Sequence, residues 1–173
     1  MRKFVIVLCL MACAFVVNAV QFPKSVQKKI DKTLIKLYPN RVVELKDIDL
    51  SEELANRYSS IKNVKISVLR SGGDELGFAC FASSKGKKDY FDYMVIFDTQ
   101  LLIEKVVVLV YRSTYGGEIM SRSWLKQFIG KTKGESMEMN KDIDGISGAT
   151  LSAPSITQGV KDLSLLITEI QTN

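Results

Sequence analysis

Residues 64–83 have the sequence VKISVLRSGGDELGFACFAS, which is typical of a β-hairpin. Apolar and polar side chains alternate over residues 64–69, and this is the period of a half-buried strand. Residues 71–74 contain two adjacent glycines and predict a turn, and residues 76–83 predict the strand that pairs back across it. The hairpin indicates that an antiparallel sheet forms the centre of the fold.

Two more strands extend this hairpin into a meander. They are predicted at residues 90–97 and 103–111, after turns at 84–89 and 98–100. Residues 106–110, VVVLV, are apolar at every position. Because such a strand must have both faces buried, we expect residues 103–111 to be a central strand that is covered on both sides.

Two helices are predicted before the meander. Residues 23–38 place apolar residues at helical spacing among five lysines. We expect this amphipathic helix to dock its apolar stripe on the domain, and a membrane surface is the alternative. A short helix is predicted at residues 51–57, with Ser51 as its N-cap.

Two further helices are predicted after the meander. A loop at 112–118 turns into a helix that ends near residue 129 and carries Trp124 and Phe128 as core anchors. A long apolar stripe predicts a last helix at 152–170, with a proline in its first turn. The fold class is therefore α+β: an antiparallel meander with helices packed against it.

Length and composition limit what the chain can do. Its 173 residues suffice for one domain with a hydrophobic core. The net charge of +5 is modest and evenly spread, so no nucleic acid is expected as a partner. The absence of histidine excludes Ser-His-Asp and Cys-His catalysis and histidine-ligated zinc. Cys80, on a predicted strand, is expected to be buried and inert.

The N-terminus is predicted to be a signal peptide that covers residues 1–19. Arg2 and Lys3 precede an apolar run that is shorter than a membrane span, and Ala19 suits signal peptidase. Two alternatives remain, a lipid anchor through Cys13 and an uncleaved membrane anchor. All three place the protein outside the cytoplasm, in the periplasm or cell envelope. An N-terminal helical segment (20–60) and a second domain (61–173) would follow.

Residues 144–152, DGISGATLS, form a loop of small and hydroxyl residues directly before the predicted last helix. Gly145 and Gly148 permit backbone conformations that other residues avoid. Such a loop can enter the active site of another protein with one hydroxyl at its tip. A phosphate attached there would lie close to the N–H groups and positive dipole of a helix start.

This loop resembles the flavinylation motif of the FMN-binding domain family. That family includes the periplasmic FMN subunits of the sodium-pumping NADH:quinone oxidoreductase and of the Rnf complexes. The resemblance covers roughly residues 61–170, and residues 124–131, WLKQFIGK, are similar to a helix of the family. It implies a flavoprotein whose FMN is bound covalently.

The resemblance also assigns roles to individual residues. Thr150 would be bonded through its hydroxyl to the phosphate of FMN, which a magnesium-dependent flavin transferase of the ApbE type supplies from FAD. Gly148 and Ala149 would give the transferase access, Asp144 is the acid of the motif, and Ser147 is its first hydroxyl residue. Because nothing near Thr150 in the sequence could activate its hydroxyl, the outside enzyme is required.

The isoalloxazine ring needs an apolar or aromatic wall and a few backbone donors. By resemblance, the loop at residues 115–119, which contains Gly117 and Glu118, is the best candidate for contact with the ring. Trp124 is a weaker candidate for stacking on it.

The leading functional hypothesis is an extracytoplasmic electron carrier with FMN on Thr150 and a membrane-bound redox partner. One alternative is a flavin-dependent reductase of a small substrate, with Tyr115 or Glu118 as proton donor. The other is a module that binds flavin or another ligand without a covalent bond. No catalytic residue and no metal site is assigned to the chain.

Overall fold

The computed structural model describes residues 22–132 and 137–172. The predicted signal peptide and the alternative anchor at Cys13 lie outside these residues. None of the described helices combines the length and the apolar character that crossing a membrane requires.

The strands form one antiparallel sheet of five, in the order β1-β2-β3-β4-β5. The strands are β1 (Glu44–Ile48), β2 (Lys62–Ser71), β3 (Asp74–Lys85), β4 (Tyr90–Phe97) and β5 (Ile103–Val110). The predicted hairpin is confirmed, since Ser71 pairs with Asp74 across a turn whose two glycines have positive φ. The meander and the α+β fold class are confirmed as well.

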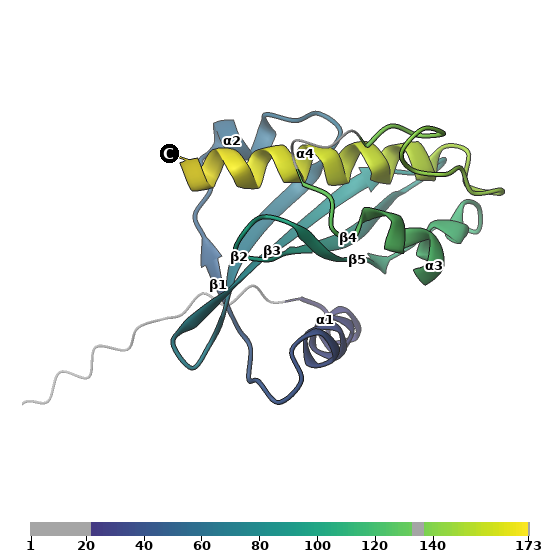
Figure 1. Cartoon of the computed structure of the whole chain (residues 1–173). Coiled ribbons are helices and arrows are strands. Elements are labelled where there is room, and N and C mark those ends of the chain that lie inside the picture. Colours follow the sequence, from purple (N-terminus) through teal and green to yellow (C-terminus); the bar gives the residue numbers. More distant parts are fainter. Residues whose placement is uncertain (1–21, 133–136, 173) are drawn as a thin grey trace, which may run out of the picture.

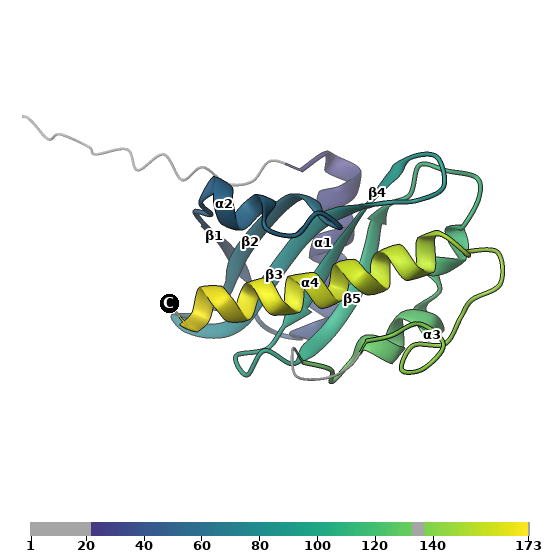
Figure 2. The same cartoon turned by 90° about the horizontal axis from the view of Figure 1, so that it is seen from above.

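Helices cover both faces of the sheet. The α-helices are α1 (Lys24–Leu37), α2 (Glu52–Asn56), α3 (Arg122–Leu125) and α4 (Ser152–Thr172). Two short 3₁₀ helices, η1 (Gly117–Met120) and η2 (Lys126–Phe128), flank α3. Figure 1 shows α4 and α2 above the sheet and α1 below it, and both views place α3 beside β5 (Figures 1 and 2).

Each face of the sheet carries its own hydrophobic core. On one face, α4 buries Ile156, Val160 and Leu163 against β3 and β4. On the other, Val26, Ile30 and Leu34 of α1 pack in a second cluster. This second cluster also contains Leu69, Ala79, Phe81, Met94, Ile96 and Leu109. The prediction that the apolar stripe of residues 23–38 docks on the domain is therefore confirmed.

The prediction that residues 103–111 form a central strand is wrong, because β5 is an edge strand. Its covering on both sides is confirmed: Val106 and Val108 belong to the α4-side core, and Leu109 belongs to the α1-side core. The uniform apolar pattern therefore indicates that helices cover both faces of the sheet at this strand. It carries no information about how many neighbouring strands lie alongside.

One other expectation from the sequence needs correction, and one strand was missed. The continuous helix expected to end near residue 129 is broken, because Ser121 is extended (φ −60°, ψ 122°) between η1 and α3. Trp124 and Phe128 are nevertheless buried, as predicted. The strand β1 was not predicted, since none of its five residues is fully buried and its pattern is weak.

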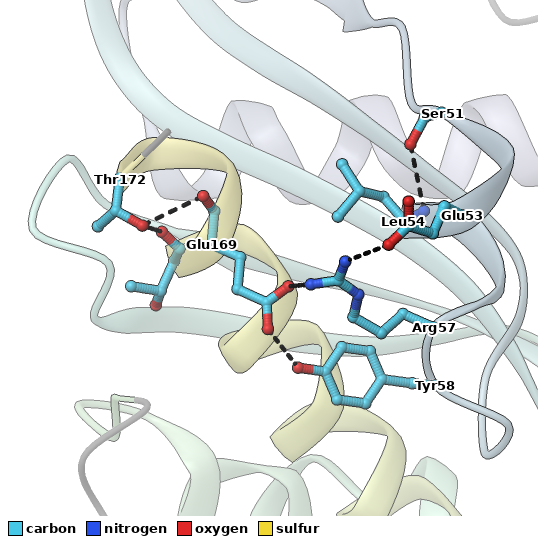
Figure 3. A network of polar contacts seen from close by, with 8 residues as sticks. Ser51, Glu53, Leu54, Arg57, Tyr58, Glu169 and Thr172 are labelled. Atoms are coloured by element: carbon cyan, nitrogen blue, oxygen red, sulfur yellow. Dashed lines mark hydrogen bonds and ion pairs between the residues drawn. The ribbon is translucent and has the colours of Figure 1, made fainter.

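The predicted burial of Cys80 and the predicted N-cap at Ser51 are both confirmed. Cys80 is fully buried, and burial raises the pKa of its thiol above the usual range. Ser51 caps α2 by accepting a hydrogen bond from the N–H of Leu54 at 3.3 Å. The same segment is tied to the end of α4 (Figure 3), because Arg57 and Tyr58 both donate to the carboxylate of Glu169, at 2.7 and 2.9 Å.

The closest packing of α4 on the sheet occurs at Gly159 and gives a test of the fold. A Cβ there would collide with the hydroxyl of Tyr93 and would lie 2.7 Å from Oγ of Ser84. We expect Gly159→Ala to lower the free energy of unfolding by about 2 kcal/mol, in the range of overpacked cores. At an unobstructed helical position, the same change would raise it by about 1 kcal/mol. Urea unfolding measures the difference.

The control is the same change in a Tyr93→Phe background. Without the phenolic oxygen the main obstacle to the new methyl group is gone, so the loss caused by Gly159→Ala should fall by about half. An equal loss in both backgrounds would contradict the packing of α4 described above.

Candidate functional site

The loop that contains Thr150 is fixed at its start by side chains of α3 and η2. The indole Nε1 of Trp124 donates a hydrogen bond to the carbonyl of Asp144 at 2.7 Å. The N–H of Asp144 donates to Oε1 of Gln127 at 2.8 Å. Trp124 is only 6% exposed and meets Phe128 edge to face. Trp124 is therefore a core residue that also positions the loop, while the carboxylate of Asp144 is left exposed.

Gly148 brings the loop against η1. Its φ is +88°, in the left-handed region that glycine tolerates best. A Cβ at this position would lie 2.6 Å from Cδ and 2.7 Å from Oε1 of Glu118. The carboxylate of Glu118 thus occupies the space beside Gly148, and the two predicted site segments meet here.

The residues around Thr150 are buried, whereas Thr150 itself is exposed. Ala149 is 1% exposed, and its carbonyl accepts a hydrogen bond from the N–H of Ala153 at 2.9 Å. Ser152 is also 1% exposed. The loop therefore directs Thr150 outward just before the first residue of α4.

The three hydroxyl residues of the loop differ in their availability. The hydroxyl of Ser152 is buried and lies 2.8 Å from that of Tyr111, so it already has a partner. Ser147 and Thr150 are both exposed, and among the described residues the Thr150 hydroxyl has no hydrogen-bond partner. Of these two, only Thr150 lines the neighbouring hollow.

This hollow has a volume of about 300 Å³. Its lining comes from the turn after β3, the loop after β5 and the loop before α4: Lys87, Tyr115, Gly116, Gly148, Ala149, Thr150, Leu151 and Ser152. Tyr115 is 54% exposed, and the Nζ atom of Lys87 lies 5.0 Å from the centre of its ring. The hollow therefore offers an aromatic ring and a cation beside the Thr150 hydroxyl.

The floor of the hollow depends on a glycine. Gly116 has φ +82°, and a Cβ there would lie 2.6 Å from both Oγ of Ser152 and the hydroxyl of Tyr111. The Tyr111 hydroxyl also donates to the carbonyl of Tyr115 at 2.6 Å. These contacts tie the loop after β5 to the start of α4, and so determine the shape of the hollow.

The structure brings most of the predicted site residues together. Gly148, Ala149 and Thr150 line the hollow. Glu118 touches Gly148, while a Cβ added at Gly117 would lie 3.9 Å from two ring carbons of Tyr111. The side chains of Ser147 and Asp144 are exposed outside the hollow.

Two residues of the site were missed by sequence analysis, Lys87 and Tyr111. The lysines of residues 84–89 resemble any solvated turn, and a tyrosine at the end of a strand carries no motif. Only the fold brings these residues to the loop. The mixed chemistry of the site, with a free hydroxyl at a helix start, an exposed aromatic ring and a lysine, fits a phosphate ester that carries a flat ring system.

Comparison with known proteins identifies one family. Residues 86–164 match the family model of the FMN-binding domain. No curated protein matches the chain. The matched segment begins in the turn after β3, includes the whole of the Thr150 loop and ends within α4. The chain is therefore an FMN-binding flavoprotein that carries a domain of the FMN-binding domain family.

Proposed function

We propose that Thr150 carries FMN through a phosphate ester and that the domain acts as an extracytoplasmic electron carrier. The observation that supports this most strongly is the state of the Thr150 hydroxyl. It is exposed and has no hydrogen-bond partner among the described residues, and it stands at the rim of a hollow directly before α4.

The attachment needs an outside enzyme, which we propose to be a flavin transferase of the ApbE type. Oγ1 of Thr150 would attack the FMN-side phosphorus of FAD and lose its proton to a base of the transferase. The new Thr150 ester bond forms as the bond between the two phosphates of FAD breaks and AMP leaves. The exposure of residues 147–151, except for Ala149, leaves this loop open to a second active site.

The chain itself would hold the attached group at two places. The start of α4 presents the positive end of its helix dipole, which stabilises an anion at the position of a Thr150 ester, although the N–H groups of Ala153 and Ser155 already bond to the carbonyls of Ala149 and Leu151. Tyr115 offers an apolar face, and Lys87 lies beside it with a positive charge for the electron-rich edge of a ring. Bound FMN supplies one-electron and two-electron redox chemistry.

The size of the hollow favours electron transfer over turnover of a small substrate. At about 300 Å³ it is at the lower limit of ligand-binding sites, with room for a ring system but little for a second molecule above it. A covalent bond also suits a protein outside the cytoplasm, where a dissociated cofactor would be lost. Export is supported by the signal-like pattern of residues 1–19. The electrons would pass to or from a membrane-bound redox partner.

The attachment site can be tested by mass. The whole chain, incubated with FAD, magnesium and an ApbE-type transferase, should gain the mass of one FMN less one water. Thr150→Ala should gain nothing, because the attacking oxygen is absent. Thr150→Ser, which keeps that oxygen, should still be modified. Intact-protein mass spectrometry measures all three.

Ser147→Ala is the matched control, since Ser147 is the other exposed hydroxyl residue of the loop. It should be modified to the same extent as the unchanged protein. Modification of Thr150→Ala, or its loss in Ser147→Ala alone, would contradict the assignment to Thr150.

A second prediction concerns Gly148. Gly148→Ala introduces a methyl group against the Glu118 carboxylate, and it places a non-glycine residue at φ +88°. The displaced loop should be modified more slowly by roughly fivefold to a hundredfold, which corresponds to about 1–3 kcal/mol of local strain. The rate of flavin incorporation is followed by fluorescence of the denatured protein in a gel.

Gly145→Ala in the same loop is the control. Its φ is not in the left-handed region, and the added Cβ would meet only Oδ1 of Asn140, at 3.0 Å. We expect less than about a twofold change in rate, as for a surface substitution away from special backbone geometry. Equal effects of the two substitutions would show that the geometry at Gly148 is not required.

A further inference from the structure

A second hollow of about 350 Å³ lies away from the Thr150 loop, along the outer edge of β5. We call it the edge groove. Its lining comes from α1, β5 and the segment from η1 to the residue after η2: Lys29, Lys32, Thr33, Lys36, Leu37, Lys105, Val106, Val107, Val108, Met120, Arg122, Leu125, Lys126 and Ile129. In Figure 1, α1 lies below the sheet and α3 lies beside β5, so the edge of β5 runs between them.

The charge of the edge groove has one sign. Six of its lining residues are lysine or arginine, and none is acidic. Two acids lie next in sequence to lining residues but do not line the groove: Glu104, which accepts a hydrogen bond from the hydroxyl of Tyr38 at 2.5 Å, and Asp31, which accepts one from Gln27 at 2.8 Å. An occupant with negative charge would therefore be attracted along the whole length of the groove.

The floor of the edge groove is apolar. Val106, Val107 and Leu125 line it, and the side chains of Met120 and Ile129 remain 46% and 44% exposed. Lysines on an edge strand can simply prevent its pairing with other chains. That role does not account for exposed Met120 and Ile129, because a protected edge has no need of an apolar hollow.

The exposed backbone of β5 is the third feature of the edge groove, after its positive charge and its apolar floor. At the start of the strand, the N–H and C=O of Ile103 bond to the C=O of Lys131 and the N–H of Gly130, at 2.9 and 2.8 Å. At the end, Nζ of Lys29 donates to the carbonyl of Leu109 at 3.4 Å. Between these points, an antiparallel edge strand turns the N–H and C=O of alternate residues outward, so residues 105–108 present such groups to the groove.

We propose that the edge groove binds an acidic, extended peptide segment of a partner protein, which pairs with β5 as a sixth strand of the sheet. Alternate apolar side chains of the segment would enter the floor, and its carboxylates would meet the lysines and Arg122 at the rim. The backbone hydrogen bonds to residues 105–108 distinguish this mode from simple attraction between charges.

The edge groove is also connected to the Thr150 loop. The 3₁₀ helix η1 lies between them, because Glu118 touches Gly148 while Met120 lines the groove. A partner held in the groove would therefore contact η1 only two residues from the side chain that touches the loop. The peptide site itself does not depend on the proposed attachment of FMN to Thr150.

The test uses the whole chain and a fluorescent heptapeptide of alternating glutamate and valine. Fluorescence anisotropy should show saturable binding that weakens with salt, and amide hydrogen exchange should slow at the alternate residues of 105–108 whose N–H groups face outward. Two further peptides carry N-methyl groups on the odd or on the even residues. One of them should lose binding, because only one set of backbone N–H groups faces β5.

Lys32→Glu is the informative variant and Lys28→Glu its matched control. Both residues are exposed on α1 and both changes alter the net charge equally, but only Lys32 lines the groove. Lys32→Glu should weaken peptide binding by roughly fivefold, and Lys28→Glu by less than about twofold. Failure of flavin attachment would leave both results unchanged.

Three results would overturn the proposal. The first is equal binding of both N-methylated peptides, which would mean attraction of charge without strand pairing. The second is slower hydrogen exchange elsewhere than in residues 105–108. The third is binding of the chain to vesicles of anionic phospholipid with no binding of the peptide, which would make the groove and α1 a membrane-contacting surface.

Discussion

The burial of Ala149 and Ser152 on either side of Thr150 is the constraint on which the site depends. Both residues are 1% exposed, and Ser152 is held by the hydroxyl of Tyr111 at the end of β5. Since their side chains point inward, the threonine between them is exposed at the surface. The first residue of the loop is fixed independently, by Trp124 and Gln127. An exposed hydroxyl is thus presented on a loop that is anchored at both ends.

The fold supplies this support through α4 and the layers beneath it. The helix has 21 residues and packs along one face of the sheet, where Gly159 lets it approach the hydroxyl of Tyr93. The other face is covered by α1, which leaves the long edge of β5 between α1 and α3. The same arrangement therefore produces the start of α4 at one place and the edge groove at another.

Periodicity in the sequence was sufficient to predict the sheet, α1 and α4, because their apolar stripes are long and regular. It misplaced β5 as a central strand, since a fully apolar strand reports which faces are covered and not which edges are paired. The break at Ser121 was missed as well, because buried residues on both sides of it keep a helical spacing.

The sequence predicts only the part of the site that lies within one continuous segment. Residues 144–150 form a local motif, so its glycines and its hydroxyl residues were recognised in the sequence. Lys87 and Tyr111 reach the same site from β3 and β5 through tertiary folding, and no spacing in the sequence indicates that. The positive charge of the edge groove could not be predicted from the sequence for the same reason, because its lysines and its arginine come from three separate segments.

The most direct measurement of the central claim is to locate the flavin within the chain. Digestion of the flavin-loaded protein with trypsin releases residues 142–161 as one peptide, which contains Ser147, Thr150, Ser152, Ser155 and Thr157. Fragmentation of that peptide in a mass spectrometer should place the flavin phosphate on Thr150 alone. A flavin phosphate on Ser147, or on the buried Ser152, would contradict the account of how this loop presents its hydroxyl groups.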